Sequence, residues 1–139
     1  MAGITQFEDL IAWRRARTLT SEVRRVAATR PLKQDAALGS QLRRAATSVM
    51  ANIAEGFESS TAAEFNRFLG IAKASCAEVR SHFYVALDAK LIDQGQFNSL
   101  MRLGKSTAEL VSGLKLSVMS RIELNKKGKT RKQGSDSAL

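Results

Sequence analysis

The sequence has little of the residues that build disulfides, metal sites and strand-rich folds. Its 139 residues include one proline, one cysteine and one histidine. The lone cysteine, Cys76, cannot form an internal disulfide and suits a reducing compartment. One histidine and one cysteine six residues apart form no recognisable ligand set, so we expect no metal and no cofactor. The single proline and the lack of sustained apolar–polar alternation favour helices over strands.

Long hydrophobic runs are also missing. No apolar segment approaches the roughly 18 residues of a membrane span. The N-terminal stretch MAGITQFEDL lacks the basic start and apolar run of a signal peptide. We therefore expect a cytoplasmic protein with no membrane partner. Neither a phosphate-binding loop nor a dinucleotide glycine fingerprint is present.

The chain has far fewer acidic than basic residues, so its net charge is strongly positive. The chain holds 22 Lys and Arg against 13 Asp and Glu, a formal net charge of +9. This balance favours a polyanionic partner, RNA or DNA before an anionic membrane surface. Residues 125–139 are rich in Lys and Arg, but residues 1–124 are basic without them. We divide the chain into a folded domain, 1–124, and a basic, disordered tail, 125–139.

Hydrophobic periodicity predicts four long helices, over residues 8–29, 34–55, 60–91 and 94–124. Pro31 stops the first helix, and Gly56 is expected as a left-handed cap after the second. Thr61 and Glu64 fit a capping box at the start of the third, with Ser60 as the alternative cap. Gly104 lies on the inward side of the fourth helix, where a close helix approach is expected. Short connections between long helices predict an all-α, antiparallel, up-down-up-down four-helix bundle.

The fourth helix carries more leucine than one core stripe requires. Leu103, Leu110 and Leu114 lie in a second sector beside the core-facing residues. An exposed leucine stripe is typical of a contact between subunits, so we expect a homo-oligomer. The alternative is that these leucines only widen the core stripe.

The first helix places arginines opposite its core residues. Arg14, Arg17, Arg24 and Arg25 share one sector, and Lys33, Arg43 and the tail could extend it. Guanidinium groups bind phosphate in a bidentate manner, so this surface predicts nucleic-acid binding. Aromatic residues make up 6 % of the chain and most are assigned to the core, so binding should be directed at phosphates rather than bases. The alternative is a solvated surface without a ligand.

The second helix has a polar stripe beside its apolar one. This polar stripe, which we call the polar seam, consists of Gln41, Arg44, Ser48, Asn52 and Glu55, with Glu78 of the third helix as a candidate partner for Arg44. A hydrogen-bonded seam of this kind can fix the register between helices or subunits. The alternative is that the stripe lines a pocket or pore.

One group of residues superficially suggests catalysis. Ser75, Glu78 and His82 share one side of the third helix at spacings i, i+3 and i+7. Groups stacked along one helix converge poorly on one reacting atom, and no glycine-rich oxyanion loop accompanies them. Glu78 and His82 are more simply an i,i+4 pair. We therefore predict no catalytic residues and no enzyme.

Several of these residues also form a pattern that resembles a known bacterial family. The pattern comprises Phe7 to Leu10, Trp13, Gln41 to Ala45, Ser48, Asn52 to Gly56, Glu64-Phe65 and Phe68-Leu69. It resembles the four-helix, ribosomal-protein-like proteins encoded in intervening sequences of 23S rRNA genes, which are similar to accessory proteins of diversity-generating retroelements. The resemblance extends from about Phe7 to Ile122. This chain departs from it at Ser48-Val49-Met50, where the family has a proline-containing triplet, so we expect a straighter second helix.

The resemblance implies a bundle assembled as a homo-oligomeric ring, commonly a pentamer. It also implies a basic surface suspected of binding nucleic acid and no known catalytic residues. Together with the charge pattern, it predicts a non-enzymatic protein that binds rRNA or an RNA–protein complex. The alternative is an oligomeric scaffold for a protein partner such as a polymerase, with no specific nucleic-acid role.

Overall fold

The computed structural model describes residues 3–136, and helices are the only regular elements among them. The all-α class is therefore confirmed. Four helices are long and two elements are short: η1 (Phe7–Asp9), α1 (Ile11–Ala27), α2 (Arg30–Lys33), α3 (Ala36–Glu58), α4 (Ala62–Asp88) and α5 (Gln94–Asp136). None of these helices is long and apolar enough to cross a membrane.

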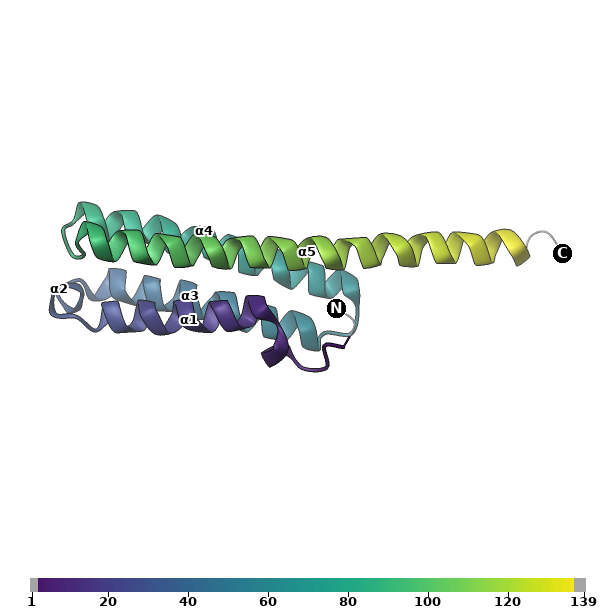
Figure 1. Cartoon of the computed structure of the whole chain (residues 1–139), viewed down its shortest axis with the longest axis horizontal. Coiled ribbons are helices and arrows are strands. Elements are labelled where there is room, and N and C mark those ends of the chain that lie inside the picture. Colours follow the sequence, from purple (N-terminus) through teal and green to yellow (C-terminus); the bar gives the residue numbers. More distant parts are fainter. Residues whose placement is uncertain (1–2, 137–139) are drawn as a thin grey trace.

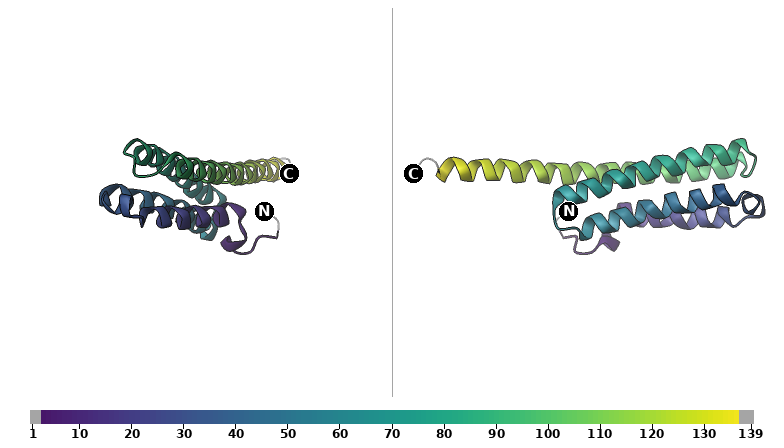
Figure 2. Two further views of the ribbon diagram at one scale, coloured as in Figure 1. Left: turned by 60° about the vertical axis from the view of Figure 1, so that its left-hand side comes forward. Right: turned by 180° about the vertical axis from the view of Figure 1, so that it is seen from behind.

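The long helices lie in two layers (Figure 1). α1 and α3 form one layer, α4 and α5 form the other, and α2 lies where the chain turns between α1 and α3. α3 packs against α1 and α4, and α5 packs against the same two helices. Two further views show the same layers and show α5 running well past the other helices (Figure 2). One side of α3 therefore faces away from the bundle.

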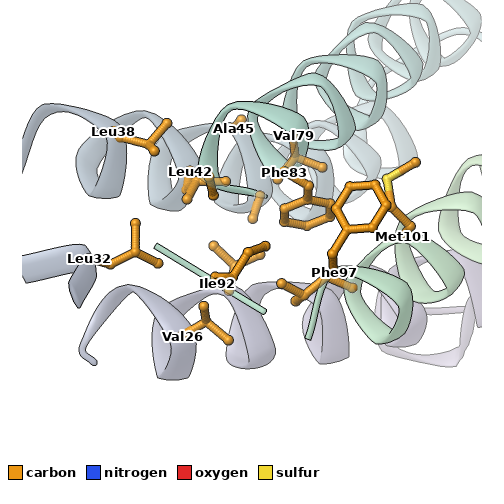
Figure 3. Packing of buried hydrophobic residues seen from close by; sticks show 14 of the residues in the cluster. Val26, Leu32, Leu38, Leu42, Ala45, Val79, Phe83, Ile92, Phe97 and Met101 are labelled. Carbon is orange, nitrogen blue, oxygen red and sulfur yellow. The ribbon is translucent and has the colours of Figure 1, made fainter. Parts of the chain in front are cut away.

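The core has two clusters of buried residues. The cluster near α2 brings Leu42, Phe83 and Phe97 together from three different helices (Figure 3). The cluster nearer the N-terminus contains Ile53 and Leu69, both fully buried. Each large apolar side chain that is fully buried contributes about 1.5–3 kcal/mol, so these clusters hold the four helices in place.

The two helices that form most of the candidate site begin at capped residues. The Asp35 side chain accepts a hydrogen bond of 3.1 Å from the backbone N–H of Leu38 at the start of α3. Thr61 Oγ1 accepts one of 3.1 Å from the N–H of Glu64 at the start of α4. Each cap satisfies an N–H that would otherwise lack a partner. The capping residue is therefore Thr61, as predicted, rather than Ser60.

The prediction for Gly56 is wrong. This glycine lies inside α3, which continues to Glu58, and it has no left-handed backbone. A Cβ at Gly56 would lie 2.8 Å from Phe68 Cβ and 2.9 Å from Phe65 Cδ1. Gly56 is therefore needed for the close approach of α3 and α4. The left-handed residue that ends a helix is Lys90, with φ of 60°, and Leu91 N–H donates back to Ala86 O.

Other helix limits differ by a few residues. The first predicted helix is divided into η1 and α1, and it stops at Ala27, before Pro31. Pro31 then occupies the first turn of α2, where its missing N–H costs nothing. Gly104 is buried, and a Cβ there would lie 2.9 Å from Arg80 Cγ, which confirms the close approach predicted at this position.

The last helix is longer than predicted. It continues past Leu124 to Asp136, so residues 125–136, which we expected to be disordered, are helical. Residues 137–139 of the predicted tail lie outside the described residues. Figure 1 shows this part of α5 extending beyond the ends of the other helices.

Candidate functional site

The arginines predicted on the outer side of α1 are all exposed, but local acidic groups engage two of them. Arg14 Nε donates to Glu8 O at 2.8 Å, and Arg14 Nη2 lies 3.5 Å from Asp9 Oδ1. Arg25 Nη2 lies 2.7 Å from Glu22 Oε2. The hydrogen bond to Glu22 and the charge of that carboxylate raise the pKa of Arg25 above its usual value.

The other two predicted arginines of α1 are less restrained. The Arg17 guanidinium lies 5.8 Å from the centre of the Trp13 ring, a cation–π arrangement that leaves its N–H groups available. Arg24 forms no ion pair within the described residues. Arg17 and Arg24 are therefore the two arginines of α1 best able to accept an external anion.

A hollow of about 760 Å³ lies over the outward side of α3, next to Arg24. We call it the α3 hollow. Arg24 of α1 lines it on one side, and Glu78 and His82 of α4 line it on the other. Between them α3 contributes Arg43, Arg44 and a row of short polar side chains, Ser40, Gln41, Thr47 and Ser48.

The charge in the α3 hollow is mainly positive. Arg24, Arg43 and Arg44 face a single acidic residue, Glu78. None of the three arginines forms an ion pair in the part of the chain that the structure describes. Arg43 is half-buried, and a Cβ at Gly39 would lie 3.3 Å from its Nη1, so the glycine gives the guanidinium room.

Two polar atoms of residues that line the α3 hollow are themselves buried and have no hydrogen bond to the described residues. They are Thr47 Oγ1 and His82 Nε2. His82 Nε2 lies 3.5 Å from Glu78 Oε1, close enough for an ion pair if the ring is protonated but too poorly placed for a hydrogen bond. A buried polar atom without a partner costs about 1–3 kcal/mol, so both atoms call for an explanation.

Part of the polar seam joins α3 to α4. Ser48 Oγ and Ser75 Oγ are 2.9 Å apart, and Asn52 Nδ2 donates to Ser48 O at 2.8 Å. Ser75, which the sequence suggested only as a weak catalytic candidate, is thus a buried partner of the polar seam.

The remaining members of the polar seam are not drawn together in this way. Arg44 and Glu78 form no ion pair within the described chain, and Glu55 is exposed. Gln41 lines the α3 hollow. The structure thus places Gln41, Arg44 and Glu78 along the hollow and Glu55 outside its lining, while Ser48 bridges α3 to α4 and Asn52 bonds back to Ser48 within α3.

The leucines predicted at a subunit interface lie at the margin of the core. Leu103 packs against the first core cluster, and Leu110 and Leu114 pack against the second. Each keeps part of its surface exposed. More exposed apolar side chains follow on the same helix, and the sequence analysis did not single them out: Leu116 is 66 % exposed, Met119 43 % and Leu124 67 %.

The described residues offer little for catalysis or metal binding. Cys76 is buried, and its burial raises the pKa of the thiol to about 11, which keeps it protonated and unreactive. Within residues 3–136, no three His, Cys, Asp or Glu side chains are grouped so that they could hold a metal ion.

The basic bundle and its α3 hollow fall within a recognised family. Residues 8–113 match the model of the 23S rRNA-intervening sequence protein family. The chain belongs to this family. The matched span contains the first core cluster, all of the second except Val118, and every residue that lines the α3 hollow, whereas the end of α5 lies outside it.

A solved structure supports the same fold. The chain is similar to a protein of unknown function from the S23 ribosomal protein family of Bacteroides thetaiotaomicron, with a TM-score of 0.70 and 17 % identity. The similarity covers 76 % of this chain and 98 % of that one. No curated protein matches the chain. Neither family description names an enzymatic activity, and the relation to retroelement accessory proteins stays a prediction.

Proposed function

We propose that this member of the 23S rRNA-intervening sequence protein family is a non-enzymatic protein that binds structured nucleic acid, rRNA or an RNA–protein complex before DNA. The observation that carries the proposal is the run of arginines, exposed on α1 and half-buried at Arg43, that leads from the outer side of α1 to the α3 hollow. Arg17, Arg24 and Arg43 are its central contacts, and Arg14 and Arg25 lie along its edge.

The two arginines with acidic neighbours can still contribute. The side chains of the Arg25–Glu22 pair are 64 % and 40 % exposed, and those of the Arg14–Asp9 pair are 62 % and 37 % exposed. Exposed ion pairs stabilise a protein by about 0–1 kcal/mol, so a phosphate can compete for either arginine. Large exposed aromatic side chains are rare on this surface, which favours contacts with phosphates over stacking on bases.

A salt titration of binding to a structured RNA, a DNA duplex and a polyanion control tests this function. The logarithm of the binding constant should fall with the logarithm of salt concentration by about 0.7–0.9 for each phosphate neutralised. A chain ending at Leu124 separates the bundle from the basic end of α5. We expect this shorter chain to keep most of its preference for RNA.

Charge reversal locates the surface. Arg17→Glu with Arg24→Glu should weaken RNA binding at least tenfold without unfolding the protein. Lys73→Glu with Arg102→Glu is the matched control, because it changes the net charge equally at exposed positions on α4 and α5. Equal losses in the two double variants would mean that only net charge matters and that α1 carries no binding surface.

We further propose that the antiparallel bundle assembles in the cytoplasm into a homo-oligomeric ring, a pentamer, through α5. The partly exposed Leu103, Leu110 and Leu114 support such a contact. So does their continuation into the exposed Leu116 and Met119. The polar seam would then fix the register of α3 against α4 within each subunit.

A second candidate function is a scaffold for a protein partner such as a polymerase. The last part of α5 favours it, because Leu116, Met119 and Leu124 are exposed and offer an apolar contact that the core does not use. Association with purified partner candidates that resists high salt and is lost on Leu116→Gln with Met119→Gln would support this function. Association that disappears with salt would favour nucleic-acid binding.

A further inference from the structure

The α3 hollow has features that an arginine-rich surface does not require. It combines three arginines that form no ion pair with the described residues, an open hollow of about 760 Å³ and, in the lining residues Thr47 and His82, two buried polar atoms without a hydrogen bond to those residues. Because a flat arginine surface would leave every polar group in contact with water, the buried Thr47 Oγ1 indicates a more specific role. We propose that the α3 hollow is a discrete binding site for one phosphate group.

The positions along α3 explain how the site would work. Arg43 and Thr47 are one helical turn apart and so lie on the same side of α3, and Arg24 of α1 lines the same hollow. Guanidinium groups from two helices can hold several oxygens of one phosphate at once. The Thr47 hydroxyl is buried, and a rotation of its side chain toward the hollow would let it donate to another phosphate oxygen and gain the hydrogen bond that it lacks among the described residues.

The opposite side of the hollow sets the orientation of the ligand. Glu78 and His82 lie there, and the Glu78 carboxylate repels a phosphate. The phosphate therefore lies toward α1, between Arg24 and Arg43, and the space toward α4 accommodates the attached sugar. His82 lines that space, and a rotation of its ring would bring the buried Nε2 within reach of a sugar hydroxyl.

This inference rests on the proposed function only for the source of the phosphate, which is either the 5′ end of an RNA or a phosphodiester within it. The site itself can be tested without RNA. His82 is the single histidine of the chain, so its imidazole NMR signals need no assignment. The Thr47 methyl is a second probe, and it is identified by its loss in Thr47→Val.

Inorganic phosphate is titrated into the full chain at constant pH and ionic strength. We expect saturable shifts of the Thr47 methyl and the His82 imidazole. Arg24→Gln with Arg43→Gln should weaken phosphate binding about tenfold or more, whereas Lys73→Gln with Arg102→Gln, the matched control at exposed positions on α4 and α5, should leave it unchanged. Thr47→Val should also weaken it while leaving the chain at least as stable to urea, because the lost hydroxyl had no partner.

Shifts that rise linearly without saturation, or equal losses in the Arg24/Arg43 and Lys73/Arg102 double variants, would overturn the phosphate site. They would leave nucleic-acid binding by the α1 surface untouched, since RNA affinity is measured separately with the Arg17 and Arg24 variants. Two RNA oligonucleotides, one with a 5′-phosphate and one with a 5′-hydroxyl, then identify the source. If the 5′-phosphate RNA binds more tightly and this difference is lost in Thr47→Val, the site binds RNA ends. If both RNAs bind equally and both lose affinity in Thr47→Val, the site binds internal phosphodiesters.

Discussion

Gly56 and Gly113 both lie inside long helices, yet their surroundings are opposite. A Cβ at Gly56 would lie 2.8 Å from Phe68 Cβ, whereas a Cβ at Gly113 would meet nothing within 4 Å. Helix propensity alone favours alanine over glycine by about 1 kcal/mol at either position. The lack of space between α3 and α4 therefore decides whether alanine at Gly56 raises or lowers the stability of the protein.

Gly56→Ala should lower the free energy of unfolding by about 1–3 kcal/mol, because the added methyl forces α3 and α4 apart. Gly113→Ala should raise it by about 0.5–1 kcal/mol. Urea denaturation of the two variants and the parent chain measures both changes. A Gly56→Ala variant more stable than its parent would show that the phenylalanines move aside easily.

The thiol of Cys76 makes a prediction about pH. Its pKa is raised from 9.0 to about 11 by burial, so the folded state favours the protonated thiol. The contribution of the protonated thiol to the free energy of unfolding is fully present below pH 9. It is lost as the pH rises to 11, because the thiol of the unfolded chain releases its proton at a lower pH. Between pH 9 and pH 10 this loss amounts to about 1 kcal/mol.

Urea denaturation of the parent chain and Cys76→Ala at pH 8 and pH 10 separates this contribution from other titrating groups. The stability advantage of the parent over the variant should shrink at the higher pH. In addition, iodoacetamide should modify Cys76 of the folded protein far more slowly than that of the unfolded chain. An advantage that is independent of pH would mean that the thiol is less buried than the structure shows.

Whole helices were predicted better than their ends. Apolar residues repeating along the chain located the four long helices, and the Thr61–Glu64 pair located the start of α4, because both signals are local. Gly56 was misassigned because its role depends on Phe65 and Phe68 of the next helix. The continuation of α5 past Leu124 was missed because its basic composition is equally typical of a disordered end.

The cap of α4 offers a test at this scale. Thr61→Ala should reduce the free energy of unfolding by about 0.5–2 kcal/mol, because the N–H of Glu64 loses its hydrogen bond. Ser60→Ala, one residue earlier and exposed, should change it by less than about 0.5 kcal/mol. Thermal or urea denaturation of Thr61→Ala and Ser60→Ala measures both changes and identifies the capping residue. If the two changes were reversed, Ser60 would be the cap in solution.

The whole molecule shows what single helices cannot. The α3 hollow needs Arg24 from α1, Arg43 and Thr47 from α3, and His82 from α4, so no local pattern predicts it. The Arg25–Glu22 pair, in contrast, has the i,i+3 spacing and could have been anticipated from the sequence. The arginine surface was thus predicted as a whole, but the division into engaged and available arginines required the packed bundle.

Assembly gives a further prediction at this scale. Leu110→Gln with Leu114→Gln should shift the protein toward monomers, measured by light scattering after size-exclusion chromatography, if α5 joins the subunits. Both leucines also pack against the core, so the variant should lose some stability as well. Leu116→Gln with Met119→Gln changes side chains that lie outside the core clusters, so it tests self-assembly without that loss of stability. An unchanged oligomer in both variants would exclude α5 as the interface.

The end of α5 changes how far the protein's charge reaches. Residues 122–136 extend about 22 Å as a helix, at 1.5 Å per residue, and their basic residues include Lys126, Lys127, Lys129 and Arg131. Ionic screening at physiological salt acts over about 8 Å. A polyanion near the end of α5 is therefore attracted by these four residues, while salt screens it from the charges on the bundle. The helix enlarges the capture radius of the molecule, so its removal should slow association with RNA more than it speeds dissociation.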